Sequence, residues 1–197
     1  MHHLRARAVA CFAVLFALSF DTRADDPSMP TFVPWKVLNA GDEPLKTDLV
    51  LYWIPSSRDE MRRSPLLTSR PLAIDSTQCV GMQIIRPDDE ANIAKFGATG
   101  ALPIAILATR DGTMLEAIIS KDGMLSLNNI EKMVREQLTK RAADADRLLD
   151  MAKERVDAGD RDMAITYYRH VCAQRCLFPR KAKDAQKALH KLGVEER

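Results

Sequence analysis

The chain has 197 residues, of which 46% are hydrophobic and 28% charged, so it is too apolar to be disordered throughout and has the length of one domain with a small appendage. Residues 1–24 hold three of the 29 basic side chains and one of the 27 acidic ones, so the rest of the chain has no net charge. We therefore expect no nucleic-acid binding through the phosphate backbone, which needs a basic surplus on one face.

The first 24 residues have the pattern of a secretory signal peptide. Two arginines precede the apolar run at 8–20, and Thr22-Arg23-Ala24 places small residues where a signal peptidase cleaves. The run is shorter than the roughly 20 residues that span a bilayer. We expect an exported protein, periplasmic or extracellular, that begins near Asp25 and has no stable membrane span after cleavage. An uncleaved anchor is the alternative.

The stretch from 48 to 119 predicts a sheet. Residues 48–54, DLVLYWI, form a continuous apolar run, which is typical of a strand buried on both faces. Further strands are expected at 79–85, at 102–108 and at 114–119. The last two are separated by Asp111-Gly112, a hairpin-turn signal.

Capping signals place helices around these strands. Ser57 and Glu60 form an S-x-x-E capping box, and Pro65 is expected to kink the helix that follows. Asp88 is expected to cap a short helix that Gly97 ends. A further helix is expected to start at Asn128, with an apolar face made by Ile130, Met133, Val134 and Leu138.

The composition changes after Lys140, and no strand signal follows. Apolar stripes at helical spacing predict three helices, with a break at Gly159-Asp160 and a new start at Pro179. The stripes are Ala145, Leu148, Leu149, Ala152 and Val156, then Ala164, Ile165, Tyr168, Val171 and Cys172, then Ala182, Ala185, Leu189 and Leu192. The sequence thus predicts a small helical unit attached to an α/β domain.

Residues 52–67, YWIPSSRDEMRRSPLL, resemble the thioredoxin segment around its C-G-P-C motif. Tyr52-Trp53 matches the family's aromatic-Trp pair, and Pro65 follows Glu60 at the distance of the family's helix-kinking proline. Residues 94–115 resemble the family's K-Y-G-x-x-x-x-P-T segment, which makes Pro103 the counterpart of its cis-proline. The resemblance covers about residues 48–140 and implies a thioredoxin-like three-layer α/β domain.

The same resemblance puts Ser57 and Glu60 at the two cysteine positions of the thioredoxin motif. Thioredoxin chemistry needs a thiolate with a lowered pKa and a second thiol to resolve the mixed disulfide, and these side chains supply neither. We interpret the pair as a helix cap and expect no catalytic residue and no cofactor. A Ser nucleophile or a Glu acid/base is the alternative, but His170 and His190 both lie in the tail.

By analogy with the family, the segments 55–58 and 102–104 predict a groove that holds an extended peptide through backbone hydrogen bonds. Its candidate residues are Trp53, Pro55, Ser56, Ser57, Leu102 and Pro103. Pro103 has a second interpretation, because a cis X-Pro bond also serves to fix the geometry of a loop.

Residues 145–192 resemble a tetratricopeptide repeat followed by a further helix, with Gly159, Ala164, Tyr168 and Pro179 near that repeat's positions. Arg155 departs from the pattern, because an aromatic residue is usual there. One repeat cannot bury its own apolar face. We therefore expect it to pack on the thioredoxin-like domain, or otherwise on a partner.

Without the leader the chain has three cysteines, Cys79, Cys172 and Cys176, an odd number. Cys172 and Cys176 are four residues apart in an expected helix, where Cβ atoms lie about 5–6 Å apart, whereas a disulfide needs about 3.8 Å. We interpret them as two buried structural thiols and expect no metal site. A local disulfide, a working redox pair and metal binding with His170 are the alternatives.

These observations divide the chain into a signal peptide (1–24), an N-terminal linker or edge segment (25–47), a thioredoxin-like domain (48–141) and a tetratricopeptide-like helical hairpin or repeat extension (142–197). The predicted function is a redox-inactive module that binds a protein or peptide. The alternative is a thiol-disulfide oxidoreductase or redox sensor that uses Cys172 and Cys176, with Cys79 as a third participant. A structural part of a larger envelope assembly is a third possibility.

Overall fold

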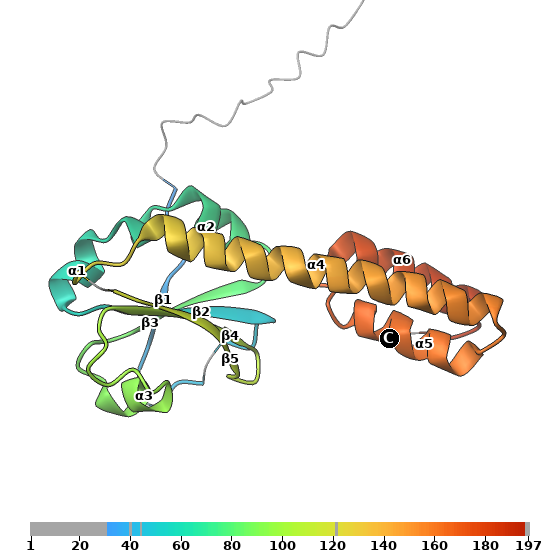
Figure 1. Cartoon of the computed structure of the whole chain (residues 1–197), viewed down its shortest axis with the longest axis horizontal. Helices are drawn as coiled ribbons and strands as arrows, with labels where there is room; N and C mark the ends of the chain where they lie inside the picture. The colour runs from blue at the N-terminus through green and yellow to red at the C-terminus, as the bar shows by residue number, and fades with distance from the viewer. Residues whose placement is uncertain (1–30, 40, 44, 121, 196–197) are drawn as a thin grey trace, which may run out of the picture.

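A computed structural model describes residues 31–39, 41–43, 45–120 and 122–195. The predicted signal peptide at 1–24 lies outside these residues. The described chain forms a five-stranded sheet and six α-helices, and the C-terminal helices extend well beyond the sheet (Figure 1).

The sheet has the strand order β1-β3-β2-β4-β5. Its strands are β1 (Lys36–Leu38), β2 (Leu49–Ile54), β3 (Val80–Ile85), β4 (Ile104–Thr109) and β5 (Met114–Ile119). β3 is parallel to both β1 and β2, whereas β4 is antiparallel to β2 and to β5. The four predicted strands are confirmed. β1 is an additional edge strand within the segment predicted as a linker or edge.

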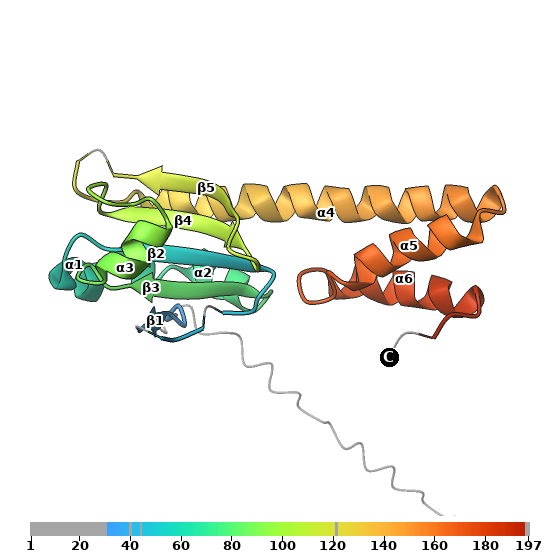
Figure 2. The ribbon, with the colours of Figure 1, turned by 90° about the horizontal axis from the view of Figure 1, so that it is seen from below.

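The two faces of the sheet are covered by different helices, as Figure 2 shows. One face packs against α2 (Arg70–Ser76) and the first part of α4 (Leu127–Asp157), and the other against α3 (Glu90–Lys95). Successive strand side chains point to opposite faces. Leu49, Leu51 and Trp53 of β2 therefore enter one core, and Val50, Tyr52 and Ile54 enter the other. This confirms that the apolar run in β2 is buried on both faces.

Pro65 divides the predicted kinked helix instead of bending it. α1 (Arg58–Arg63) ends before Ser64, whose ψ of 139° is extended, and a 3-10 turn, η1 (Pro65–Leu67), leads to α2. The cause is steric, because a residue that precedes proline is disfavoured in the helical region. Two predicted cap positions were also slightly wrong: Asp89 caps α3 in place of Asp88, and Ser126 caps α4 in place of Asn128.

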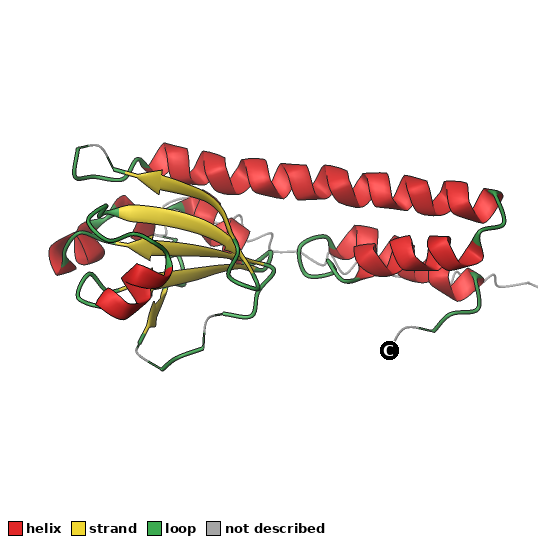
Figure 3. Cartoon of the chain, turned by 60° about the horizontal axis from the view of Figure 1, so that its bottom comes forward, coloured by secondary structure: helices red, strands yellow, loops and turns green. Residues whose placement is uncertain are grey.

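The predicted boundary at 141/142 falls inside α4, a continuous helix of 31 residues. At 1.5 Å per residue this helix is about 46 Å long. Its second part packs with α5 (Arg161–Cys172) and α6 (Pro179–Lys191), and we call residues 142–195 the arm. Figure 3 shows α5 and α6 alongside the second part of α4, beyond the end of the sheet.

The arm has a core of its own, which the single-repeat argument did not foresee. Its buried residues are Ala152, Ala164, Ile165, Tyr168, Val171, Ala185 and Leu189, all from α4, α5 and α6. The Lys181 ammonium of α6 forms an ion pair with the Asp146 carboxylate of α4 and donates a hydrogen bond to the Ala142 carbonyl at 3.0 Å. α5 and α6 thus bury their apolar faces against the second part of α4 rather than against the sheet.

Candidate functional site

The strand register brings the two predicted groove segments together. Ile54 at the end of β2 pairs with Ile104 at the beginning of β4. Residues 55–57, which follow β2, and residues 102–103, which precede β4, therefore leave the sheet at the same end. The Leu102–Pro103 peptide bond is cis, as the resemblance implies for Pro103.

Ser57 and Glu60 act as a helix cap. The Ser57 hydroxyl oxygen accepts a hydrogen bond from the Glu60 backbone N–H at 3.2 Å, which satisfies one of the open donors at the start of α1. The Glu60 carboxylate accepts from the Ser56 backbone N–H and from the Ser56 hydroxyl, both at 2.7 Å. In the predicted capping box the glutamate should accept from the N–H of the cap residue Ser57, but the Glu60 carboxylate accepts from Ser56 instead.

Trp53 is buried and forms no part of the surface between the two predicted groove segments. Its side chain is fully buried, and the Trp35 ring packs edge-on against it with 5.6 Å between centroids. Its indole nitrogen has no hydrogen-bond partner in the structure. Pro55 and Pro103 are also buried, so Ser56, Ser57 and Leu102 are the accessible members of the predicted set. The prediction that Trp53 contacts a ligand is therefore wrong, because its position on β2 points it into the core.

Leu102 is half-buried and lies at the edge of a cavity of about 710 Å³ between α3 and residues 99–102. Within the described chain, the N–H and C=O groups of Leu102 form no backbone hydrogen bond, whereas the Pro103 carbonyl accepts from Ser120 N–H at 3.2 Å. An extended segment beside Leu102 would therefore find one open donor and one open acceptor.

Two groups near this end of the sheet, Tyr52 and Asp88, have perturbed pKa values. Burial raises the pKa of Tyr52, which lies on β2 and packs against Phe96. A hydrogen bond from Arg58 lowers the pKa of Asp88, and this pair at 2.7 Å links α1 to the loop before α3. These shifts keep Tyr52 neutral and Asp88 ionised at neutral pH, which suits structural roles for both groups.

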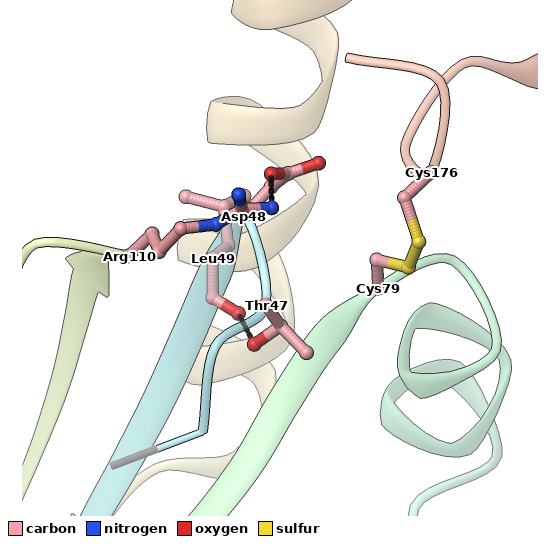
Figure 4. The surroundings of a disulfide bond; sticks show 6 residues. All are labelled: Thr47, Asp48, Leu49, Cys79, Arg110 and Cys176. Carbon is pink, nitrogen blue, oxygen red and sulfur yellow. Dashed lines mark hydrogen bonds and ion pairs between the residues drawn. A yellow bond between two sulfur atoms is a disulfide. The ribbon is translucent and has the colours of Figure 1, made fainter. Parts of the chain in front are cut away.

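The opposite end of the sheet holds a disulfide that the sequence reasoning missed. Cys79, just before β3, is bonded to Cys176 in the turn between α5 and α6, with 5.7 Å between their Cα atoms (Figure 4). The structure therefore does not contain the Cys172–Cys176 disulfide that was considered as an alternative, and Cys176 is not a buried thiol as predicted. Three cysteines allow several pairings, and only the tertiary structure shows which two residues meet.

A cleft between the sheet and the arm borders this bond at Cys176. A cavity of about 530 Å³ is lined by Cys172, Cys176, Asp48 and three arginines, Arg110, Arg169 and Arg175. Arg110 forms an ion pair with Asp48 at 2.5 Å, as Figure 4 shows. The Cys172 thiol donates a hydrogen bond to the Ala182 carbonyl of α6 at 3.7 Å. The cleft therefore combines one cysteine of the disulfide, a thiol and three arginines.

A second cavity of about 440 Å³ shares Asp48 and Arg110 with the first and extends to Asp111, Arg141 and His170. Hydrogen bonds from Thr109 and Thr113 lower the pKa of Asp111, which keeps its carboxylate charged. His170 thus lies at the arm cleft and not beside Ser57. Among the described residues there is no group of three or more His, Cys, Asp or Glu side chains placed to hold a metal ion.

Comparisons with known proteins give no family assignment. No family model matches the chain, and a search of curated proteins finds no significant relative. In the part of the chain that the structure describes, none of the helices combines the length and the apolar composition needed to cross a membrane.

Proposed function

We propose that this chain is an exported, redox-inactive thioredoxin-like protein that binds an extended segment of a protein or peptide partner beside Leu102. The observation that carries the proposal is the juxtaposition of the Ser56-Ser57 loop with Leu102, whose N–H and C=O groups make no backbone hydrogen bond to another described residue. An extended chain that pairs with such groups gains affinity from main-chain hydrogen bonds.

The thioredoxin-like part of the proposal is supported by the sheet. A mixed five-stranded sheet with β1-β3-β2-β4-β5 order places the segment that resembles the thioredoxin motif after β2, at the N-terminus of α1. The loss of redox chemistry at this position is supported by the roles of Ser57 and Glu60, whose polar atoms are engaged in capping. The Cys79–Cys176 disulfide supports export, because such bonds persist mainly in oxidising compartments.

The binding activity is tested with a reduced, carboxymethylated model protein as an extended polypeptide probe. Leu102→Asp introduces a charge at the groove, and we expect it to weaken binding by at least about tenfold, which corresponds to about 1.4 kcal/mol. Ile74→Asp is the matched control, because it puts the same charge on an exposed apolar residue of α2. Equal affinities for both variants, or no binding by the parent protein, would contradict the proposed function.

The fold assignment is tested separately by restoring the motif. Ser57→Cys combined with Glu60→Cys should give dithiothreitol-dependent insulin reduction above that of the parent, because one sulfur would then lie at the start of α1 and a second would resolve the mixed disulfide. Ser57→Cys alone lacks the resolving thiol and is the control. A folded double variant with no gain over this control would show that residues 57–60 are not the counterpart of the thioredoxin motif.

A further inference from the structure

Two cysteines of the described chain, Cys172 and Cys176, line the arm cleft, and the third, Cys79, is bonded to one of them. Cys176 is bonded to Cys79, and Cys172, four residues earlier, lines the same cavity as Cys176. We propose that this cleft is a site of intramolecular thiol-disulfide exchange, in which the Cys172 sulfur attacks Cys176 and displaces Cys79. The proposal goes beyond the peptide-binding function and does not depend on it.

The exchange needs no external oxidant or reductant. The Cys172 thiolate forms a bond to the Cys176 sulfur while the Cys79–Cys176 bond breaks, and its electron pair remains on the Cys79 sulfur. Cys172 loses its proton to solvent before the attack, and Cys79 takes up a proton from solvent afterwards. One disulfide and one thiol are present on each side of the reaction.

The local backbone removes the geometric objection to a bond between residues four apart. In a helix that spacing holds the Cβ atoms too far apart for a disulfide. α5, however, ends at Cys172, and residues 173–177 are in turns. The Cys172 carbonyl accepts from Arg175 N–H at 3.1 Å, a bond between residues three apart instead of the four of an α-helix. Helical geometry therefore does not fix the distance between the two sulfurs.

The charges in the cleft favour the reactive form of a thiol. Arg110, Arg169 and Arg175 line the cavity with both sulfurs, whereas Asp48 is its one carboxylate. Asp48 is paired with Arg110, and Arg175 adds a further positive charge to the lining. Positive neighbours stabilise the thiolate, which is the species that attacks a disulfide.

The accessibility of the sulfurs fits these roles. Cys176, the sulfur to be attacked, belongs to an exposed residue of the turn, and Cys79, the leaving group, is half-buried at the end of the sheet. Cys172 is half-buried and donates to the Ala182 carbonyl, a hydrogen bond that is lost when the thiol ionises. The exchange would remove the disulfide between the arm and the sheet and leave α4 as their covalent connection.

The test locates the disulfide in oxidised protein expressed from the full chain. The protein is held at pH 8 with excess iodoacetamide, and the alkylated and disulfide-linked peptides are mapped without reduction. We expect a fraction of molecules to have alkylated Cys79 with a Cys172–Cys176 disulfide, and this fraction should not depend on protein concentration. Cys172→Ser, in which both remaining cysteines stay bonded, should lose Cys79 alkylation completely.

Alkylation confined to Cys172, with Cys79–Cys176 as the one disulfide recovered, would overturn the proposal. Cys79→Ser provides a second measurement that does not depend on the exchange rate. When the reduced variant is oxidised with oxidised glutathione, we expect Cys172–Cys176 as the main product. Separate glutathione adducts on both cysteines would show that the two sulfurs cannot meet, and would refute the exchange without affecting the peptide-binding proposal.

Discussion

The Cys79–Cys176 disulfide should make a large contribution to stability, which is measured by replacing both cysteines with serine. The bond closes a loop with a sequence separation of 97 residues, and the Cα–Cα distance of 5.7 Å is usual for disulfides. In the chain-entropy model, a cross-link over about 100 residues stabilises the native state by about 4.7 kcal/mol. We expect Cys79→Ser/Cys176→Ser to lose that amount of unfolding free energy. Among the described residues the double variant retains only Cys172, so no replacement disulfide can form between them.

The assay is reversible unfolding in urea, monitored by far-UV circular dichroism. The parent is unfolded without reductant, so that its disulfide stays intact, and the variant is unfolded without oxidant. In a chain of this length, each kcal/mol of lost unfolding free energy lowers the Tm by about 2–4 °C. In a thermal melt of the same variant we therefore expect the Tm to fall by about 9–19 °C. Cys172→Ser is the control, because it keeps the bond and its hydroxyl can still donate to the Ala182 carbonyl. A double variant within about 1 kcal/mol of the parent would refute the entropic reasoning, since typical disulfides contribute more.

Three further predictions concern the sheet and the contact between α2 and α4. Leu107→Ala in β4 should cost about 2–5 kcal/mol in unfolding free energy, because the side chain is fully buried, whereas Leu115→Ala on β5 should cost much less; urea unfolding compares the two. Ser69→Ala should cost about 1–3 kcal/mol in the same assay, because it removes the cap on Leu72 N–H and leaves the Glu131 carboxylate without its 2.8 Å hydrogen bond. Burial raises the pKa of Asp75, so its ionisation opposes folding as pH rises above the unfolded value of about 3.9. Asp75→Asn should therefore become more stable relative to the parent between pH 4 and pH 7, and a pH-independent difference in unfolding free energy would contradict that reasoning.

The sequence predicted elements whose signals are local or periodic. The apolar run in β2 was recognised because a strand buried on both faces has no polar alternation, and Ser57, Asp160 and Pro179 were recognised because helix starts have their own chemistry. β1 was not predicted as a separate strand, because three residues in a Pro-rich segment carry little strand signal. Its formation depends on pairing with β3.

The features that the sequence did not predict depend on tertiary geometry. Cys79 and Cys176 are distant in sequence, and nothing in the local pattern indicates that the turn after α5 reaches the start of β3. The continuity of α4 was missed because the change in composition after Lys140 suggested a boundary, and Lys140 and Arg141 stand at that change. The structure places both within the helix where it passes from the sheet to the arm. Trp53 was assigned to the groove from its place beside the motif, whereas strand alternation determines that it points into the core.

The strand registers separate the two proposed activities. Leu49 pairs with Val80 and with Thr109, so Asp48, Cys79 and Arg110 gather at the end of the sheet where β2 begins. Ile54 and Ile104 mark the other end, beside Leu102. The six residues of β2 between them span about 20 Å at 3.3 Å per residue. A charge placed at Leu102 should therefore leave the distribution of disulfides unchanged, and Cys172→Ser should leave peptide affinity unchanged. If either substitution changes the result at the other site, loss of the disulfide to the arm must alter β2. This strand is the element that connects the two sites, because its ends lie beside the residues of both.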